Sequence, residues 1–155
     1  MTTDPIRKSI TVPLEPARAF TLFTEEMDRW WPKDSHSLAA ADDEGDKARV
    51  RVEPREGGQV IETLPDGSEA AWATVTTWQP GTRFAMRWYV GRPEDEATEV
   101  DVSFTATEAG TRIDLTHSGF AALGAEAETM CASYTTGWDH VLGTCFKRAC
   151  ATVPA

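Results

Sequence analysis

The chain has 155 residues, with 15 lysines and arginines against 25 aspartates and glutamates, so its formal net charge is −10. This length suits one domain, and we expect residues 1–155 to fold as a single unit. An acidic chain without a basic stripe disfavours nucleic acids and anionic membrane surfaces as partners, and no apolar run is long enough to span a bilayer. The first ten residues lack the apolar stretch of a secretory signal, which predicts a cytoplasmic protein.

The N-terminal third predicts one strand and two short helices. Hydrophobic and polar residues alternate over residues 6–12, as in an amphipathic strand. A short helix is expected to begin at Pro16, because proline loses no hydrogen bond at the first helical position. A second short helix is expected over residues 25–31, ended by Pro32. The polar, acidic segment 33–47 is predicted to be a mobile loop.

The middle of the chain predicts an antiparallel meander. From residue 48 to residue 118 hydrophobic residues recur at every second position, between turns rich in glycine, proline and aspartate. Six strands are expected, at Arg49–Glu53, Gly58–Thr63, Ala70–Trp78, Arg83–Val90, Thr98–Ala106 and Thr111–Ser118. Trp72 and Val75 can share a face of the sheet only if a β-bulge lies between them.

The C-terminal segment, residues 124–151, contains no proline and predicts one long helix. Its apolar stripe recurs at three and four positions and comprises Trp138, Val141, Leu142, Cys145, Phe146 and Ala149. Gly137 is a poor helix former, at a cost of ~1 kcal/mol against alanine, and its missing side chain leaves room for a close neighbour. The three cysteines are too far apart or on different helix faces to pair, so free thiols in a reducing compartment are expected.

Short motifs along the chain carry a resemblance to a known family. They are Val12-Pro13 with Glu15-Pro16 and Ala19-Phe20; Asp28-Arg29-Trp30-Trp31-Pro32; Glu56-Gly57-Gly58; Pro80 before the strand Arg83–Trp88; Gly110-Thr111-Arg112; Thr116-His117-Ser118-Gly119-Phe120; and Gly137-Trp138 before Val141-Leu142. In this order the chain resembles the SRPBCC/START-like superfamily, specifically its heat-shock-protein-90 ATPase activator-like family. The resemblance implies an α+β helix-grip fold, in which a curved antiparallel sheet of about seven strands wraps around a long C-terminal helix, with two short helices after the first strand. It also implies a cavity for an apolar ligand between sheet and helix.

The residues that could carry chemistry are few. His117 lies on the apolar phase of its strand, so it is either a core histidine satisfied by its neighbours or a polar group inside a cavity, where it could act as a general acid or base. Ser118 faces the opposite side of the sheet and cannot pair with it as a nucleophile. Scattered histidines and cysteines lack metal-site spacing, and no glycine-rich phosphate loop precedes a helix. No metal, cofactor or catalytic residue is therefore predicted.

Trp30 and Trp31 allow two interpretations. They form the lip of a pocket, as Phe120 also could, or they plug one end of the sheet. Because the two residues are adjacent, one of them is expected to face outward if the other faces inward.

The leading hypothesis is a protein that binds a small hydrophobic molecule, because apolar cavities with a few polar groups are typical ligand sites. The expected lining is Trp30, Trp31, Met86, Trp88, Phe104, Leu115, His117, Phe120, Tyr134, Trp138, Val141 and Leu142. Two alternatives stay open, an enzyme of the polyketide cyclase or dehydratase type and a co-chaperone-like module that binds a chaperone partner. Arg87 is expected to face outward, which disfavours the enzyme. The sequence does not decide whether the chain forms a homodimer.

Overall fold

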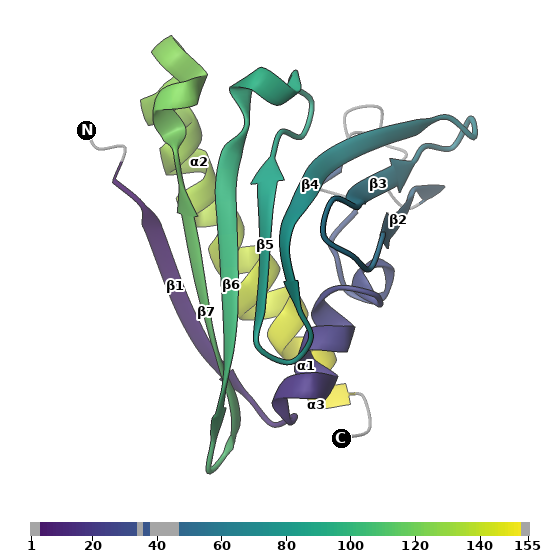
Figure 1. The fold of residues 1–155 in the computed structure, drawn as a ribbon, viewed down its shortest axis with the longest axis vertical. Helices are drawn as coiled ribbons and strands as arrows, with labels where there is room; N and C mark the ends of the chain where they lie inside the picture. Colours follow the sequence, from purple (N-terminus) through teal and green to yellow (C-terminus); the bar gives the residue numbers. More distant parts are fainter. Residues whose placement is uncertain (1–3, 34–35, 38–46, 153–155) are drawn as a thin grey trace.

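The fold is a strongly curved sheet that holds a long C-terminal helix (Figure 1), as seen in a computed structural model that describes residues 4–33, 36–37 and 47–152. The elements in chain order are β1 (Ile6–Val12), α1 (Pro16–Phe23), the 3-10 turn η1 (Met27–Arg29), β2 (Arg49–Val52), β3 (Gln59–Thr63), β4 (Glu69–Gln79), β5 (Arg83–Trp88), the 3-10 turn η4 (Glu94–Glu96), β6 (Thr98–Thr107), β7 (Gly110–Ser118), the 3-10 segment η5 (Phe120–Glu126), α2 (Ala127–His140), the π-helical segment η6 (Val141–Phe146) and α3 (Lys147–Thr152). The predicted α+β helix-grip fold is confirmed. The loop predicted over residues 33–47 lies mostly outside the described residues. No helix within the described ranges is long and apolar enough to cross a membrane.

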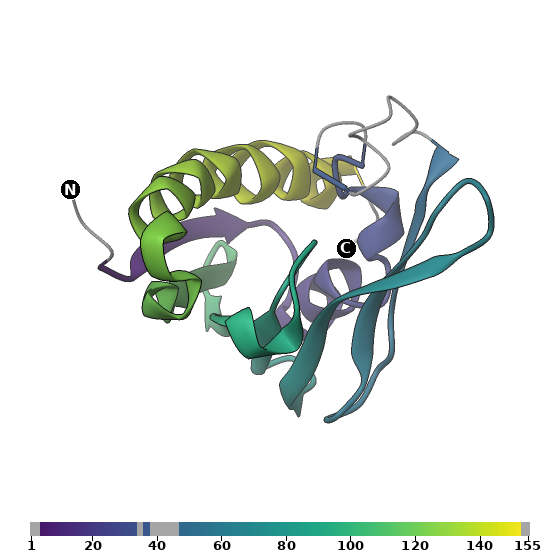
Figure 2. The same ribbon diagram turned by 90° about the horizontal axis from the view of Figure 1, so that it is seen from above.

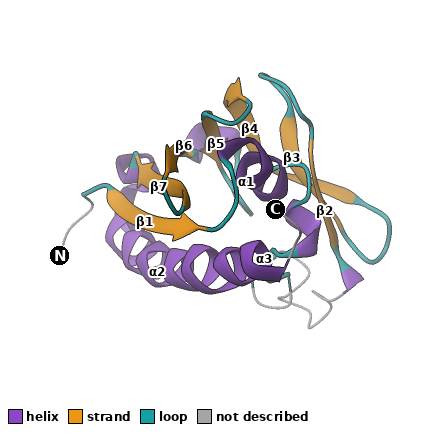
Figure 3. Cartoon of the chain, turned by 90° about the horizontal axis from the view of Figure 1, so that it is seen from below, coloured by secondary structure: helices purple, strands orange, loops and turns teal. Residues whose placement is uncertain are grey.

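The sheet has seven antiparallel strands in the order β1-β7-β6-β5-β4-β3-β2. Strands β2 to β7 form the predicted meander, and β1 adds to its far edge by pairing with β7, from Ile6 opposite His117 to Val12 opposite Thr111. Seen from its two ends, the hollow of the sheet carries α2 and α3 along its open side, and α1 within it (Figures 2 and 3). Contacts of α1 with β6 and β7, and of α2 and α3 with β1, fix this arrangement.

Aromatic rings fill the end of the hollow where α1 lies. Phe20 of α1 packs edge-on against Phe104 of β6, with ring centroids 5.3 Å apart. Phe23, one turn later, contacts Phe84 of the sheet at 6.2 Å and Phe146 of the C-terminal helix at 5.1 Å. Edge-to-face pairs contribute roughly 0.5–1.5 kcal/mol each beyond the area they bury. These rings therefore supply much of the core in a chain that has few large aliphatic residues.

Strand β4 carries the irregularity that its hydrophobic pattern predicts. Val60 of β3 lies opposite Ala73 and Ile61 lies opposite Ala71, which leaves Trp72 as an extra residue. A bulge of this kind bends the strand and increases its twist. It allows Trp72, Ala73 and Val75 all to be buried, although they break strict alternation.

The C-terminal helix differs from the prediction of one regular helix over residues 124–151. It begins at Ala127, because Gly124 has the non-helical angles φ 58° and ψ −124°. It then widens at Val141–Phe146, where the Lys147 N–H bonds the carbonyl of Leu142, five residues back. A regular α-helix drifts by about 40° for every four residues, and a π-helical segment, which turns less per residue, offsets this drift. Trp138, Leu142, Phe146 and Cys150 thus stay buried at a spacing of four, whereas Cys145 and Ala149 are half-buried.

The positions of Trp30 and Trp31 differ from the expectation that one of them faces outward. Trp30 and Trp31 are both buried, at 6% exposure each, so neither faces outward. Alternation does not apply to them, because they follow the short η1 turn rather than lying in a strand. Each indole N–H reaches a different carbonyl: Trp30 donates to Leu22 at 2.8 Å and Trp31 donates to His36 at 2.7 Å.

Candidate functional site

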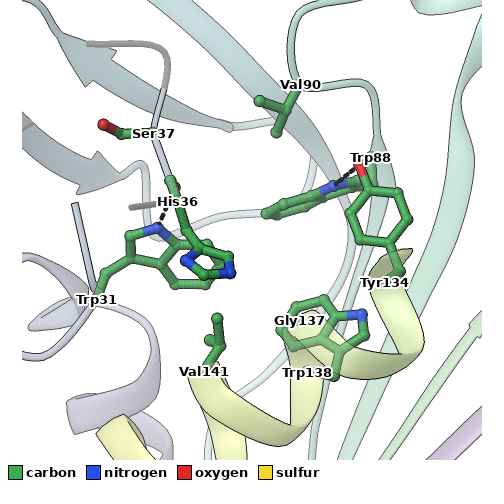
Figure 4. A pocket seen from close by; sticks show the side chains of 9 residues that line it. All are labelled: Trp31, His36, Ser37, Trp88, Val90, Tyr134, Gly137, Trp138 and Val141. Atoms are coloured by element: carbon green, nitrogen blue, oxygen red, sulfur yellow. Dashed lines mark hydrogen bonds between the residues drawn. The ribbon is translucent and has the colours of Figure 1, made fainter. Parts of the chain in front are cut away.

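A pocket of about 220 Å³ lies between the C-terminal helix, the end of β5 and the segment after η1 (Figure 4). Its described lining is mostly aromatic and aliphatic and comprises Trp31, His36, Ser37, Trp88, Val90, Tyr134, Gly137, Trp138 and Val141. The three structural units meet here because β5 ends, α2 passes over it and Trp31 turns inward from η1. The pocket therefore occupies the part of the hollow that the rings of α1 do not fill.

Three tryptophans form the walls of this pocket. The centroid of Trp31 lies 5.9 Å from that of Trp88 and 6.2 Å from that of Trp138, and Trp88 lies 6.0 Å from Trp138. The buried Trp72 supports them from behind, with its centroid 5.2 Å from Trp31. Such a set of indole faces suits contact with flat, apolar groups.

Tyr134 places the hydroxyl of a phenol at the pocket. The indole N–H of Trp88 donates a hydrogen bond to the Tyr134 oxygen at 3.1 Å. Burial raises the pKa of Tyr134, so the side chain is a neutral phenol at physiological pH. Its ring packs against that of His117, with centroids 4.6 Å apart, which holds the phenol in place.

His117 is fully buried behind Tyr134 and does not line the pocket. The Trp138 indole N–H donates to His117 Nδ1 at 2.9 Å, so that nitrogen carries no hydrogen. The hydrogen is therefore on Nε2, which donates to the Thr98 hydroxyl at 2.7 Å; that hydroxyl donates in turn to the Trp88 carbonyl at 3.3 Å. Burial lowers the pKa of His117 to about 3, so the ring is neutral. Of the two interpretations, this geometry supports the satisfied core histidine.

His36, Ser37, Val90 and Gly137 line the pocket although sequence reasoning did not include them. Gly137 opens space on α2, since a Cβ added there would lie 3.7 Å from Nε2 of His36. The His36 ring also packs against that of His140, with centroids 5.4 Å apart. The missing side chain at Gly137 was a usable signal, and Val90 lies on the predicted inward phase. Nothing in the sequence pattern marked His36.

The twelve residues predicted to line the cavity divide into two groups. Five line the pocket: Trp31, Trp88, Tyr134, Trp138 and Val141. Seven are buried in the core without lining it: Trp30, Met86, Phe104, Leu115, His117, Phe120 and Leu142. Of the seven, Phe104 and Trp30 pack against the phenylalanines of α1, whereas His117 and Phe120 pack against the ring of Tyr134.

Two further polar features bear on the chemistry of the site. Glu62 of β3 is fully buried and accepts a hydrogen bond from the Trp72 indole N–H at 2.9 Å, behind the tryptophan walls. Arg87 is exposed, as predicted, and pairs with Glu94 at 3.1 Å. Within the described parts of the chain, no group of three or more His, Cys, Asp or Glu side chains is placed to hold a metal ion.

Comparisons with known proteins agree with this fold. Residues 13–150 match the family described as Activator of Hsp90 ATPase homolog 1-like protein. The fold is similar to MLL2253 from Mesorhizobium loti, with a TM-score of 0.69 and 13% identity over 97% of this chain and 99% of that one. It is also similar to the AHSA1-like protein from Aeromonas hydrophila, with a TM-score of 0.61 and 22% identity over 93% and 90% of the two chains. Txn09, described as an anthrahydroquino-gamma-pyrone synthase, is 30% identical over 84% of this chain and 87% of its own, with a TM-score of 0.56. No curated protein matches the chain.

Proposed function

Because the chain belongs to the Activator of Hsp90 ATPase homolog 1-like family of the SRPBCC superfamily, we propose that it binds a small hydrophobic molecule between α2 and the end of β5. The observation that carries this proposal is a pocket of about 220 Å³ walled by three tryptophans. Its volume is below the ~300–1,000 Å³ of pockets for drug-sized ligands, which favours a compound of one or two rings.

The composition of the lining supports an uncharged ligand. Among the described residues that line the pocket there is no Asp, Glu, Lys or Arg. A charged ligand group placed there would lose its water without gaining an ion pair, and this costs several kcal/mol. Apolar walls, in contrast, gain roughly 25 cal/mol for every Å² of apolar surface removed from water.

Titration of the intrinsic tryptophan fluorescence tests the proposal. Trp31, Trp88 and Trp138 line the pocket, so a bound ligand should change their emission in a saturable way. The panel should contain small aromatic, polycyclic and aliphatic compounds. If none of them produces a saturable change in protein whose near-ultraviolet circular dichroism shows a fixed aromatic core, the proposal is wrong.

A second candidate function is an enzyme of the polyketide cyclase or dehydratase type. The 30% identity to Txn09, whose name describes a synthase of a fused ring system, supports it. Tyr134 and His36 are the titratable side chains among the described lining residues, and they would have to move any proton. Incubation with anthrahydroquinone-type compounds, followed by mass spectrometry, separates the two functions, since a binding protein returns each compound unchanged.

We also infer that the protein works in the reducing environment of the cytoplasm as one domain. Cys131, Cys145 and Cys150 form no disulfide bond, which supports this location. Cell fractionation with an antibody to the chain tests the location directly.

A further inference from the structure

We propose that the Tyr134 hydroxyl selects ligands that carry a neutral hydrogen-bond acceptor on a flat aromatic ring, such as aryl ketones and quinones. The inference rests on the proposed function, because it concerns the same pocket. It narrows that function from small hydrophobic molecules in general to one chemical class.

The direction of one hydrogen bond is the starting point. An indole N–H can only donate, so in the contact between Trp88 and Tyr134 the phenol oxygen is the acceptor. The hydrogen of the Tyr134 hydroxyl must therefore point elsewhere. No described residue accepts it, and Tyr134 lines the pocket (Figure 4). The Tyr134 hydroxyl can therefore donate this hydrogen to a bound ligand.

The neighbours of Tyr134 do not compete for that hydrogen. The adjacent His117 ring accepts from Trp138 on Nδ1 and donates from Nε2 to Thr98, so it has no acceptor left. Arg92, whose charge acts to lower the pKa of Tyr134, is only a hydrogen-bond donor. Its guanidinium pairs with Glu96 at 2.8 Å and with Glu126 at 2.9 Å. Because the phenol stays protonated, it offers a donor rather than a negative charge.

The other residues that line the pocket indicate which kind of ligand carries the hydrogen-bond acceptor. The indole rings of Trp31, Trp88 and Trp138 line the pocket and favour an aromatic ring beside the hydroxyl. A carboxylate would also accept the hydrogen bond, but no cation among the described lining residues would balance its charge. A carbonyl oxygen meets both conditions, since it accepts one hydrogen bond and carries no charge. A system of about two fused rings suits the volume of about 220 Å³.

Three matched probes test the inference by isothermal titration calorimetry: 2-acetylnaphthalene, 2-ethylnaphthalene and 2-naphthoate. The first two have nearly the same shape and differ in the carbonyl oxygen. A net hydrogen bond of 0.5–1.5 kcal/mol corresponds to about 2- to 12-fold tighter binding of the ketone by the unmodified protein. The carboxylate should bind more weakly than the hydrocarbon.

Two variants assign the preference to the hydroxyl. Tyr134→Phe should bind ketone and hydrocarbon equally well. Tyr89→Phe removes a phenol hydroxyl that lies outside the pocket lining and contacts Thr74, so this control should retain the preference for the ketone.

The outcomes separate this inference from the proposed function. A preference for the ketone that disappears in Tyr134→Phe and persists in Tyr89→Phe supports the inference. Equal affinities in the unmodified protein, or a preference that persists in Tyr134→Phe, overturn it and leave hydrophobic binding intact. If compounds of the wider panel bind but none of the three probes does, the inference is again wrong. If nothing in the panel binds, both proposals fail.

Discussion

The buried ring of His117 makes the stability of the protein depend on pH. Burial holds the pKa of this side chain at about 3 in the folded protein, against about 6.5 in an unfolded chain. Between these values the unfolded chain binds a proton that the folded protein does not. The contribution of His117 to the free energy of unfolding should therefore be constant above about pH 7. It should fall as the pH drops below 6.5, by at most ~1.4 kcal/mol per pH unit. Urea unfolding at pH 7.5, 6.0 and 5.0 measures this slope.

Matched variants identify the residue responsible. His117→Gln loses the packing of the buried ring, so its free energy of unfolding should be lower at pH 7.5. Because it also lacks a titrating ring, this free energy should fall less between pH 6.5 and 5. His140 is exposed, and His140→Gln should keep the slope of the unmodified protein. The same slope in His117→Gln as in the unmodified protein would contradict the assignment.

The three thiols should differ in reactivity because they differ in burial. Burial raises the pKa of Cys150 to about 12, and Cys131 is also buried. Cys145 is half-buried and lies 3.5 Å from Nε2 of His140. At pH 8, iodoacetamide should therefore modify Cys145 first and the other two only after unfolding. A mass-spectrometric time course checks this order, and Cys145→Ser should lose the fast reaction. Rapid modification of Cys150 would refute it.

At the scale of elements, the two glycines of the C-terminal helix provide a matched pair. Gly137 lines the pocket, whereas a Cβ on Gly143 meets nothing within 4 Å. Both leucine substitutions improve helix propensity by up to about 1 kcal/mol, but only Gly137→Leu extends a branched side chain into the pocket. It should weaken ligand binding at least tenfold, while Gly143→Leu leaves the affinity unchanged. Fluorescence titration and thermal unfolding measure the two effects.

A smaller substitution sharpens this test. The Cβ of Gly137→Ala would make an ordinary contact with His36, so this variant should fold normally and lose less affinity than Gly137→Leu. Equal ligand affinities in the two leucine variants would mean that the space beside Gly137 plays no part in binding.

Most elements could be predicted from hydrophobic periodicity, and the failures have identifiable causes. Alternation predicted each strand of the meander and the irregularity at Trp72, because one face of every strand is buried. The same rule failed for Trp30 and Trp31, which follow a 3-10 turn. The π-helical segment Val141–Phe146 could not be predicted, since a stripe at three and four positions fits an α-helix equally well.

At the scale of the whole molecule, the pocket could be predicted only in part. Periodicity identified which side chains face the hollow, and Trp88 and Trp138 are among the five that line the pocket. Periodicity could not show that Phe20 and Phe23 fill the end of the hollow where α1 lies, because contact between distant elements is not encoded in local spacing. His36 also lines the pocket, although it belongs to no periodic pattern.

Replacement of Trp72 and replacement of Trp88 should lower the free energy of unfolding by different amounts. Trp72 has no exposed surface, and its loss leaves the buried Glu62 without an indole donor, so Trp72→Ala should cost at least the ~3–5 kcal/mol of a packed aromatic. Trp88 borders the pocket, so Trp88→Ala removes fewer contacts and should cost clearly less. Urea unfolding of both variants measures the difference. Equal losses would mean that the pocket is closed in solution.

The pairing of β1 with β7 has a consequence for the order of events during synthesis. β1 leaves the ribosome before the other six strands of the sheet, and its single neighbour in the sheet is the last strand of the meander. Local hairpins among β2 to β6 can close early, whereas β1 must wait until residue 118 has emerged. A nascent chain that stalls before β7 therefore exposes an unpaired amphipathic strand, and such edges pair readily with other chains. The time between translation of β1 and translation of β7 is thus the interval in which this protein is most exposed to aggregation.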